Sequence, residues 1–415
     1  MGTVSAYEFD YLVVGDHDIS DGNAHAVSRE TFGWLDSCCY RAEAADMCWL
    51  RPARWRGRRA VQLTNFVGVV QPPNGPAIEV LPKVGRVNAG GVDEARTLLI
   101  DMLRCMPGFR HIQTDHAKLL AARMPLLEVF IAEFLSSVQA IVKRGLRGDY
   151  VQKLGDLFEL RGKLLVSQHL RRNLVRADRF FTEHDEFSTN RPENRLLRTA
   201  LCRVLTETRN VENQRFAREL DFLFVDIPVS PDIVSDFARV RKVRGMDYYD
   251  NALAWARLIL EGNSPLTGTG KYQAPSLLFP MEAVFEAFVA MHLQHQVPHP
   301  LVLKSQVHTK HLVVHRDQHW FRLKPDLLLL EGRKIRMVLD TKWKLLDSAL
   351  NGASDKYGLS EADFYQLHAY GHCYLQGVGH LALVYPKTDT FREPLKFDFL
   401  QTSDGNPPVF HGVQK

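Results

Sequence analysis

The chain has 415 residues, of which 45% are hydrophobic and 24% are charged. At roughly 100 to 200 residues per domain this length predicts several domains. No stretch approaches the roughly 18 uncharged apolar residues that a membrane span needs, so the composition excludes a membrane protein and wholesale disorder. The 52 Lys and Arg residues against 48 Asp and Glu residues give a net charge of +4, which excludes a histone-like polybasic protein.

The cysteines and the first residues predict the compartment. The six cysteines include no C-x-x-C pair, so neither a disulfide framework nor a zinc knuckle is expected. The first residues, MGTVSAYEFDYLVVGDHD, lack the cationic and apolar segments of a secretory signal. We therefore expect reduced thiols and a cytoplasmic location.

Residues 1–90 are predicted to form a β-rich N-terminal domain. Two β-type runs, 61–70 and 77–84, flank the turn cluster QPPNGP and predict a hairpin. A basic tract precedes them and surrounds Trp55; its arginines are Arg51, Arg54, Arg56, Arg58 and Arg59. Such a tract either binds a partner or nucleic acid through charge and ring stacking, or is a solvated loop or edge strand. The sequence leaves both interpretations open.

Residues 91–265 are predicted to form a helix-rich middle domain. Apolar residues recur at every third or fourth position in 92–106 and 125–146, and similar patterns continue to about residue 262. The stretch FELRGKLLVSQHL interrupts them and is irregular or β-type. Basic clusters at 171–179 and 239–244 are either solvated helix faces or surfaces that bind phosphates or an acidic partner.

A linker is expected at 263–275, where NSPLTGTGKYQAP is rich in Gly, Pro, Ser and Thr. Its Gly270 and Lys271 resemble the end of a phosphate-binding loop. However, Pro265 stands where G-x-x-x-x-G-K-[ST] needs Gly, and Tyr272 stands where it needs Ser or Thr. The chain is therefore not expected to hydrolyse nucleotides by itself.

Residues 266–415 are predicted to form an α/β domain around a mixed sheet. A helix at 279–294 is followed by several short β-type runs, a second helix at 360–375 and the buried-looking strand LALVYP. The first helix carries Glu282 and Glu286 together at one edge of its apolar stripe.

Acidic residues flank two neighbouring β-type runs of this domain. Asp326 enters one run and Asp340 lies near the end of the next, so the two carboxylates can converge. Lys342 follows Asp340 by two positions, and strand periodicity places both side chains on one face. A buried acid pair is costly unless a cation compensates it, and oxygen ligands favour Mg²⁺ or Mn²⁺ over zinc.

With Glu286 as an added ligand, this set predicts metal-assisted hydrolysis of a nucleic-acid backbone. Lys342 would orient the attacking water or stabilise charge. The alternative interpretation is that Asp340 and Lys342 form an ordinary strand-end ion pair while Asp326 caps a turn.

Together these motifs resemble a known nuclease family. KPD at 324–326 and DTK at 340–342 resemble the PD-(D/E)xK superfamily, and Gln366 and Tyr370 resemble the Q-x-x-x-Y element of its RecB-like branch. With MEAVFEAFV upstream and VGVVQPPNGPAIEVLPKV near the N-terminus, nearly the whole chain resembles the McrC family, the nuclease subunit of McrBC-type modification-dependent restriction systems.

The resemblance implies an α+β multidomain fold with a β-rich N-terminal domain, a helical middle domain and a C-terminal PD-(D/E)xK nuclease domain. It implies catalytic roles for Asp326, Asp340 and Lys342, with Gln366 in support. Mg²⁺, or Mn²⁺, would be held by the two aspartates and Glu286. The F-E pair at 285 and 286 favours Glu286 over Glu282 as the helix ligand.

The resemblance also implies partners: double-stranded DNA with methylcytosine-type modification, and a McrB-like AAA+ GTPase hexamer. The N-terminal region would insert into the hexamer and stimulate its GTPase, and the arginine tract would contact the hexamer or DNA. Two copies of the chain are expected to meet during double-strand cleavage. The alternatives are an assembly or DNA-binding subunit that activates an AAA+ NTPase without cutting, and a stand-alone metal-dependent nuclease.

Overall fold

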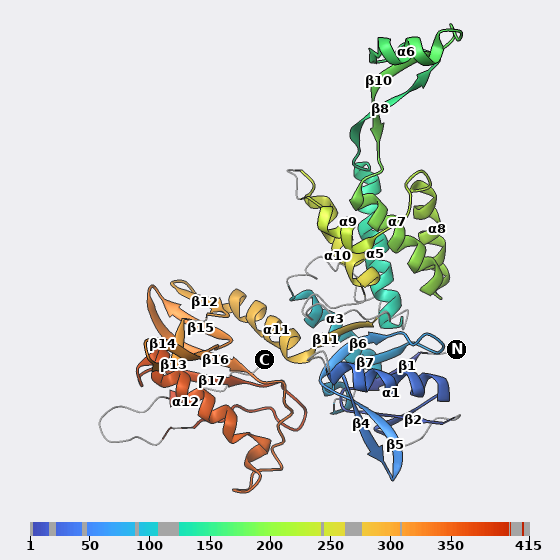
Figure 1. Cartoon of the computed structure of the whole chain (residues 1–415). Helices are drawn as coiled ribbons and strands as arrows, with labels where there is room; N and C mark the ends of the chain where they lie inside the picture. The colour runs from blue at the N-terminus through green and yellow to red at the C-terminus, as the bar shows by residue number, and fades with distance from the viewer. Residues whose placement is uncertain are drawn as a thin grey trace. The chain divides into compact units, whose positions relative to one another are not determined.

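The computed structural model describes residues 3–15, 22–43, 48–87, 91–106, 124–241, 245–261, 276–307, 309–397, 399 and 409–410 (Figure 1). They form a mixed α+β fold with two compact units. One unit combines residues 1–126 with 263–415, and the other comprises 127–262. The expected three-domain division stays a prediction, and it differs from this grouping because the expected N-terminal and C-terminal domains share one unit. The expected linker at 263–275 and its Gly270 and Lys271 lie outside the described residues.

The N-terminal part of the first unit contains two four-stranded sheets. One has the order β1 (Val4–Tyr7), β7 (Ile78–Leu81), β6 (Phe66–Val70) and β11 (Ser276–Pro280). The other has the order β3 (Ala24–Val27), β2 (Tyr11–Val14), β5 (Arg58–Leu63) and β4 (Leu50–Trp55). Helix α1 (Arg29–Glu43) packs on them, and Leu12, Leu35 and Val61 belong to one buried core. The predicted hairpin is confirmed, because β6 and β7 are antiparallel with Val70 opposite Ile78.

The arginine tract lies on β4 and β5, which form a hairpin whose turn contains Arg56 and Gly57. Strand β4 is an edge strand, and all five arginines are exposed. Arg51 donates a hydrogen bond to Gln62 of the neighbouring strand at 2.8 Å, and Arg59 pairs with Asp36 of α1 at 2.7 Å. This placement agrees with the charged edge-strand interpretation, while a binding role stays a prediction.

Two helices follow β7 among the described residues of this part: α2 (Val84–Val87) and α3 (Gly91–Arg104). Arg96 of α3 pairs with the buried Glu79 of β7, with Nε to Oε1 at 2.7 Å. Glu79 also accepts a hydrogen bond from the backbone nitrogen of Leu126. The buried carboxylate therefore has charged and backbone partners, as a buried charge requires.

The second unit is helical and carries a protruding β-arm (Figure 1). Its helices are α5 (Leu126–Arg144), α7 (Pro192–Glu207), α8 (Val211–Leu223), α9 (Ile233–Arg239) and α10 (Asp250–Glu261), with the short η1 (Asp247–Tyr249). Local chemistry sets their starts: Pro192 is a first-turn proline of α7, and Asn210 caps α8 by accepting from two backbone nitrogens. The arm consists of β8 (Asp149–Leu157), β9 (Lys163–Leu164), α6 (Val166–Asn173) and β10 (Phe180–Ser188).

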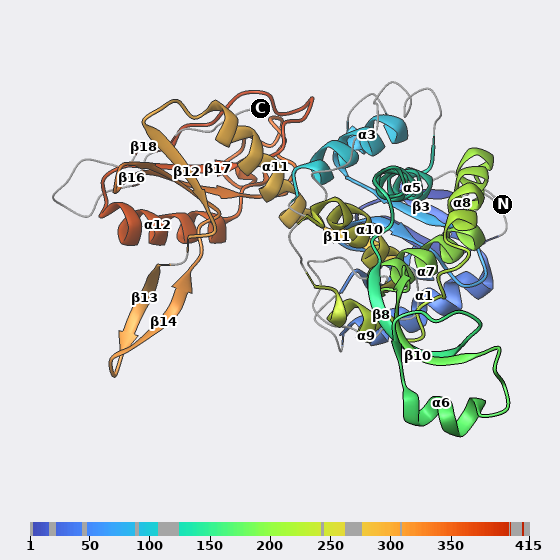
Figure 2. The same ribbon diagram turned by 90° about the horizontal axis from the view of Figure 1, so that it is seen from above.

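The C-terminal part of the first unit is built on a mixed five-stranded sheet. Its order is β12 (Leu301–Ser305), β15 (Leu327–Glu331), β16 (Lys334–Thr341), β17 (His380–Val384) and β18 (Val409–Phe410). Helices α11 (Met281–Gln296) and α12 (Glu361–Leu375) pack against it, as the sequence predicts. A separate hairpin, β13 (Lys310–His315) and β14 (Gln318–Leu323), projects from the sheet (Figure 2). No helix in the described part of the chain combines the length and apolar character that a membrane crossing needs.

Candidate active site

The strand register brings Asp326 and Asp340 together. Strands β15 and β16 are antiparallel, with Leu327 opposite Leu339, so the next pair along the ladder is Asp326 and Asp340. Asp326 immediately precedes β15, and its Oδ2 accepts hydrogen bonds from the backbone nitrogen and the hydroxyl of Thr341, both at 2.6 Å. The predicted convergence of the two carboxylates is therefore present at one end of the sheet.

Lys342 lies on the same side as Asp340, as two-residue periodicity predicts. Its Nζ is 2.6 Å from Asp340 Oδ2 and donates a hydrogen bond to Gln366 Oε1 at 3.0 Å. Its backbone nitrogen donates to Val384 of β17 at 2.8 Å, which fixes the chain just after β16. The lysine therefore joins the end of β16 to helix α12.

The Q-x-x-x-Y pair supports this lysine from α12. Gln366 Nε2 donates to the hydroxyl of Tyr370 at 2.6 Å, and that hydroxyl donates to the carbonyl of Lys324 at 2.9 Å. Burial raises the pKa of Tyr370 to about 12, so the hydroxyl keeps its proton as a donor. A chain of hydrogen bonds thus leads from Lys342 to the segment that carries Asp326.

The two glutamates of α11 have different neighbours. Glu282 accepts two hydrogen bonds from Asn65 Nδ2, at 2.6 and 2.7 Å. Glu286 instead accepts from Gln306 Nε2 at 3.3 Å, and the backbone nitrogen of Gln306 donates to the carbonyl of Asp326 at 2.9 Å. The structure therefore places Glu286, and not Glu282, beside the aspartates, whereas its role as a metal ligand stays a prediction.

Burial and like charges perturb these carboxyl groups. Burial raises the pKa of Glu286 to about 7, with Asp326 and Asp340 adding to the rise. Burial, followed by the neighbouring charge of Asp326, also raises the pKa of Asp340 to about 6, although Lys342 opposes the shift. These carboxylates are therefore close enough to repel one another, which is the arrangement that a cation relieves.

The donor set fits a hard divalent cation in its chemistry. It offers only carboxylate oxygens, and Asp340 Oδ2 is buried without an aligned hydrogen bond even though Lys342 lies close to it. Across the described residues, however, no three acidic, histidine or cysteine side chains already form a metal-binding group. The carboxylates would have to draw together around an ion.

Asp363 is a further charged residue at this site. Its Oδ2 is 2.6 Å from Lys344 Nζ, and its Oδ1 is 4.0 Å from Lys342 Nζ. The spacing of Ser360 and Asp363 resembles that of a capping box, but Ser360 caps α12 without a side-chain hydrogen bond. Asp363 lies one helical turn before Gln366, and this spacing was the signal that could have placed it at the site.

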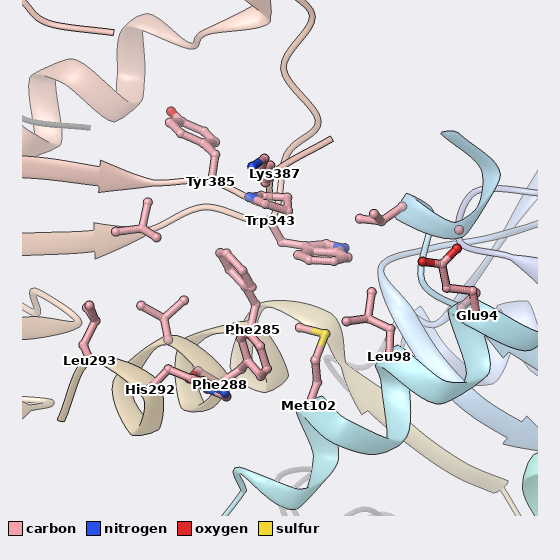
Figure 3. A pocket seen from close by; sticks show the side chains of 16 residues that line it. Glu94, Leu98, Met102, Phe285, Phe288, His292, Leu293, Trp343, Tyr385 and Lys387 are labelled. Atoms are coloured by element: carbon pink, nitrogen blue, oxygen red, sulfur yellow. The ribbon is translucent and has the colours of Figure 1, made fainter. Parts of the chain in front are cut away.

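An apolar cavity of about 290 Å³ lies beside the end of β16 (Figure 3). Phe285 and Phe288 of α11 line it together with Met102 of α3 and Trp343, which directly follows Lys342. The indole of Trp343 donates to both carboxylate oxygens of Glu8, at 3.1 and 2.9 Å. The residue after the D-x-K motif is therefore anchored to the N-terminal part of the unit.

Comparisons with known proteins identify the family. A family model described as "McrBC 5-methylcytosine restriction system component" matches residues 61–386. The chain belongs to this family. The resemblance to McrC is thereby confirmed. The acidic residues, the lysine and the glutamine of the candidate site all lie within the matched range of this McrBC component.

Solved structures share the fold of this McrBC component. The refined half-complex from a tetradecameric assembly of Thermococcus gammatolerans McrB AAA+ hexamers with bound McrC contains a chain that is 19% identical, with a TM-score of 0.73, and the match covers 99% of this chain and 94% of that chain. The cryo-EM structure of the Thermococcus gammatolerans McrBC complex matches at 20% identity with a TM-score of 0.52, covering 72% and 89%. The comparison with curated proteins gives no match.

Proposed function

We propose that this chain is the Mg²⁺-dependent DNA endonuclease subunit of a GTP-driven, McrBC-like restriction complex that acts on DNA with methylcytosine-type modification. The observation that carries the proposal is the meeting of Asp326, Asp340, Lys342 and Gln366 at one end of the sheet. An ordinary strand-end ion pair accounts for Asp340 and Lys342 but leaves the glutamine contact and the second, repelling carboxylate unexplained. Membership of the McrBC family supports the same function.

The carboxylates, the lysine and the Gln–Tyr pair have different tasks in the proposed reaction. Asp326, Asp340 and Glu286 would hold Mg²⁺ or Mn²⁺, which when bound polarises the scissile phosphate and acidifies a water molecule. Lys342 presents a cation held between Asp340 and Gln366, where it can orient a water or stabilise negative charge on the phosphate oxygens. Tyr370 fixes Gln366, so the ammonium group of Lys342 keeps its direction.

One assay tests the proposal and separates the alternatives. Full-length protein is incubated with methylated double-stranded DNA and Mg²⁺, with and without an AAA+ partner and GTP, and cleavage is measured beside GTP hydrolysis. Asp340→Ala should abolish cleavage, while Asp389→Ala, at an exposed acid paired with Arg392, is the matched control.

The outcomes discriminate clearly. Cleavage that persists in Asp340→Ala would overturn the proposed site. Stimulated GTP hydrolysis without any cleavage by the unaltered protein would favour an assembly subunit. Cleavage that needs neither the partner nor GTP would favour a stand-alone nuclease.

We further propose that the β-arm of the second unit docks on the AAA+ partner, alongside the predicted contact of the arginine tract. The arm exposes large apolar side chains, among them Tyr150, Phe158, Leu174 and Val175, the last at 93% exposure. So many exposed large apolar side chains on one projecting element favour a surface that another protein covers. The structural relatives are complexes of McrB AAA+ hexamers with McrC, which supports this choice of partner.

A further inference from the structure

The hairpin β13–β14 leads directly into the candidate active site. Strand β14 ends at Leu323, and Asp326 follows three residues later, which limits the separation to about 10 Å of extended chain. On the other side, Gln306 precedes β13 by a few residues and contacts both Glu286 and Asp326. Both roots of the hairpin are therefore attached to the proposed catalytic carboxylates.

Helix α12 fixes the base of this hairpin. The hydroxyl of Tyr374 lies 3.2 Å from the carbonyl of Val307 and 3.3 Å from that of Leu323, one at each root. Tyr370 adds its bond to the carbonyl of Lys324. A two-stranded hairpin is marginally stable alone, so these anchors hold its direction relative to Asp326.

Beyond its base, the hairpin is exposed on both faces. Nearly every residue of the two strands is open to solvent, including Trp320 at 45% and Phe321 at 68% exposure. Phe321 also has a φ of 56°, a strained conformation for a bulky side chain. An exposed aromatic pair of which one member, Phe321, has a strained backbone is typical of a surface that meets a ligand.

The charge of the hairpin points to the class of ligand. Between residues 310 and 324 the basic side chains outnumber the acidic ones; they are Lys310, Arg316, Arg322 and Lys324 against Asp317. The register puts His311 opposite Arg322 and Val313 opposite Trp320, and the rings of His315 and Trp320 lie 4.9 Å apart. One set of facing pairs therefore combines Arg322, two imidazoles and an indole, while Lys310 and the turn residue Arg316 add positive charge at the two ends of β13. This composition suits phosphates and bases better than an apolar protein surface.

We propose that this hairpin lies in a groove of duplex DNA and positions the scissile phosphate at Asp326 and Asp340. The inference rests on the proposed nuclease function and adds a DNA-contacting element to it. A two-stranded ribbon fits the major groove. Six residues per strand extend about 20 Å at about 3.3 Å per residue, the length of about six base-pair steps.

Binding of a 30-base-pair DNA duplex tests the inference. Fluorescence anisotropy is measured with full-length protein in EDTA over a range of salt concentrations, so that binding is read without cleavage. Lys310→Glu with Arg316→Glu should weaken binding at least about tenfold and lower the salt slope by about 1 to 2, because two phosphate contacts are lost. Trp320→Ala should weaken binding with little change in salt slope.

The matched control is Arg333→Glu with Lys334→Glu, at the β15–β16 turn. This turn lies at the far end of the strands, about 20 Å along β16 from Asp340. The control makes the same charge change on exposed residues and should leave affinity within about twofold. Circular dichroism shows whether each variant is folded, and the milder Lys310→Gln with Arg316→Gln serves if the glutamate pair is not.

Several results would overturn the inference. The hairpin variants could bind DNA as tightly as the unaltered protein, or the control could weaken binding as much as they do. The unaltered protein could also fail to bind the duplex, or the hairpin variants could change the oligomeric state without changing DNA affinity. The last would mean that the hairpin contacts a second copy of the chain. Cleavage that depends on Asp340 would survive such a failure, whereas failure of the proposed function would appear as cleavage that is absent or independent of Asp340.

Discussion

Replacing Asp340 by Asn should stabilise the protein while it abolishes cleavage. The side chain is almost completely buried, and burial together with Asp326 raises the pKa of Asp340 from 3.8 to about 6. A difference of one pKa unit between the folded and unfolded states is worth about 1.4 kcal/mol, so ionised Asp340 destabilises the folded state by about 3 kcal/mol at neutral pH. Asn has nearly the same shape and no charge, so we expect a gain of about 1 to 3 kcal/mol.

The effect should depend on pH in a definite direction. Because the pKa of Asp340 is raised on folding, the folded state binds more protons than the unfolded state between about pH 4 and 6, and stability falls as pH rises through that window. The Asn variant lacks this loss. Its advantage should therefore be absent near pH 4 and complete at pH 8, while the raised pKa of Glu286, about 7, leaves a residual slope in both proteins.

Urea unfolding in EDTA at pH 4.5 and pH 8 measures both quantities. Added Mg²⁺ should stabilise the unaltered protein more than Asp340→Asn, because the variant has lost a proposed ligand. Asp389→Asn, an exposed substitution, should change stability by less than about 0.5 kcal/mol. A variant that is less stable than the unaltered protein at pH 8 in EDTA would refute the argument that Asp340 is a strained buried charge.

Three further substitutions test other parts of the structure. Tyr370→Phe removes a hydroxyl that accepts from Gln366, so we expect a loss of about 1 to 3 kcal/mol in thermal unfolding and slower cleavage with little change in KM. Trp343→Phe removes the indole donor to Glu8. Burial raises the pKa of Glu8 to about 7, although Lys83 opposes the rise. The variant should therefore lose more stability at pH 8, where Glu8 is ionised, than at pH 5. Val175→Ser at the tip of the β-arm should reduce affinity for the AAA+ partner about tenfold, measured by titrating GTPase stimulation; an unchanged titration would contradict docking through the arm.

The sequence predicts the central geometry of the candidate site because that geometry depends on short-range rules. Alternation along a strand places Asp340 and Lys342 on one side, and a tight turn between consecutive strands makes Asp326 face Asp340. Helical spacing likewise places Gln366 and Tyr370 on one face of α12. These features need only the local period of each element.

Contacts between distant segments could not be predicted in this way. Glu282 and Glu286 share one edge of α11 in the sequence pattern. Their partners differ, because Glu282 accepts from Asn65, more than 200 residues earlier, and Glu286 accepts from Gln306. The pairing of β11 with β6 and the anchoring of Trp343 by Glu8 are also long-range. Alternation and helical period carry no information about which distant element an edge will meet.

The pairing of β11 with β6 limits how the protein can be divided. Strand β11 is an outer strand of the sheet β1-β7-β6-β11, and its last residue, Pro280, directly precedes the helix that carries Glu286. A C-terminal fragment that keeps β11 would present an unpaired strand, whereas one that begins at Met281 would leave β6 as an open edge on the remaining part. Unpaired edges promote aggregation. The N-terminal and C-terminal parts of this unit should therefore be expressed and purified together in one polypeptide.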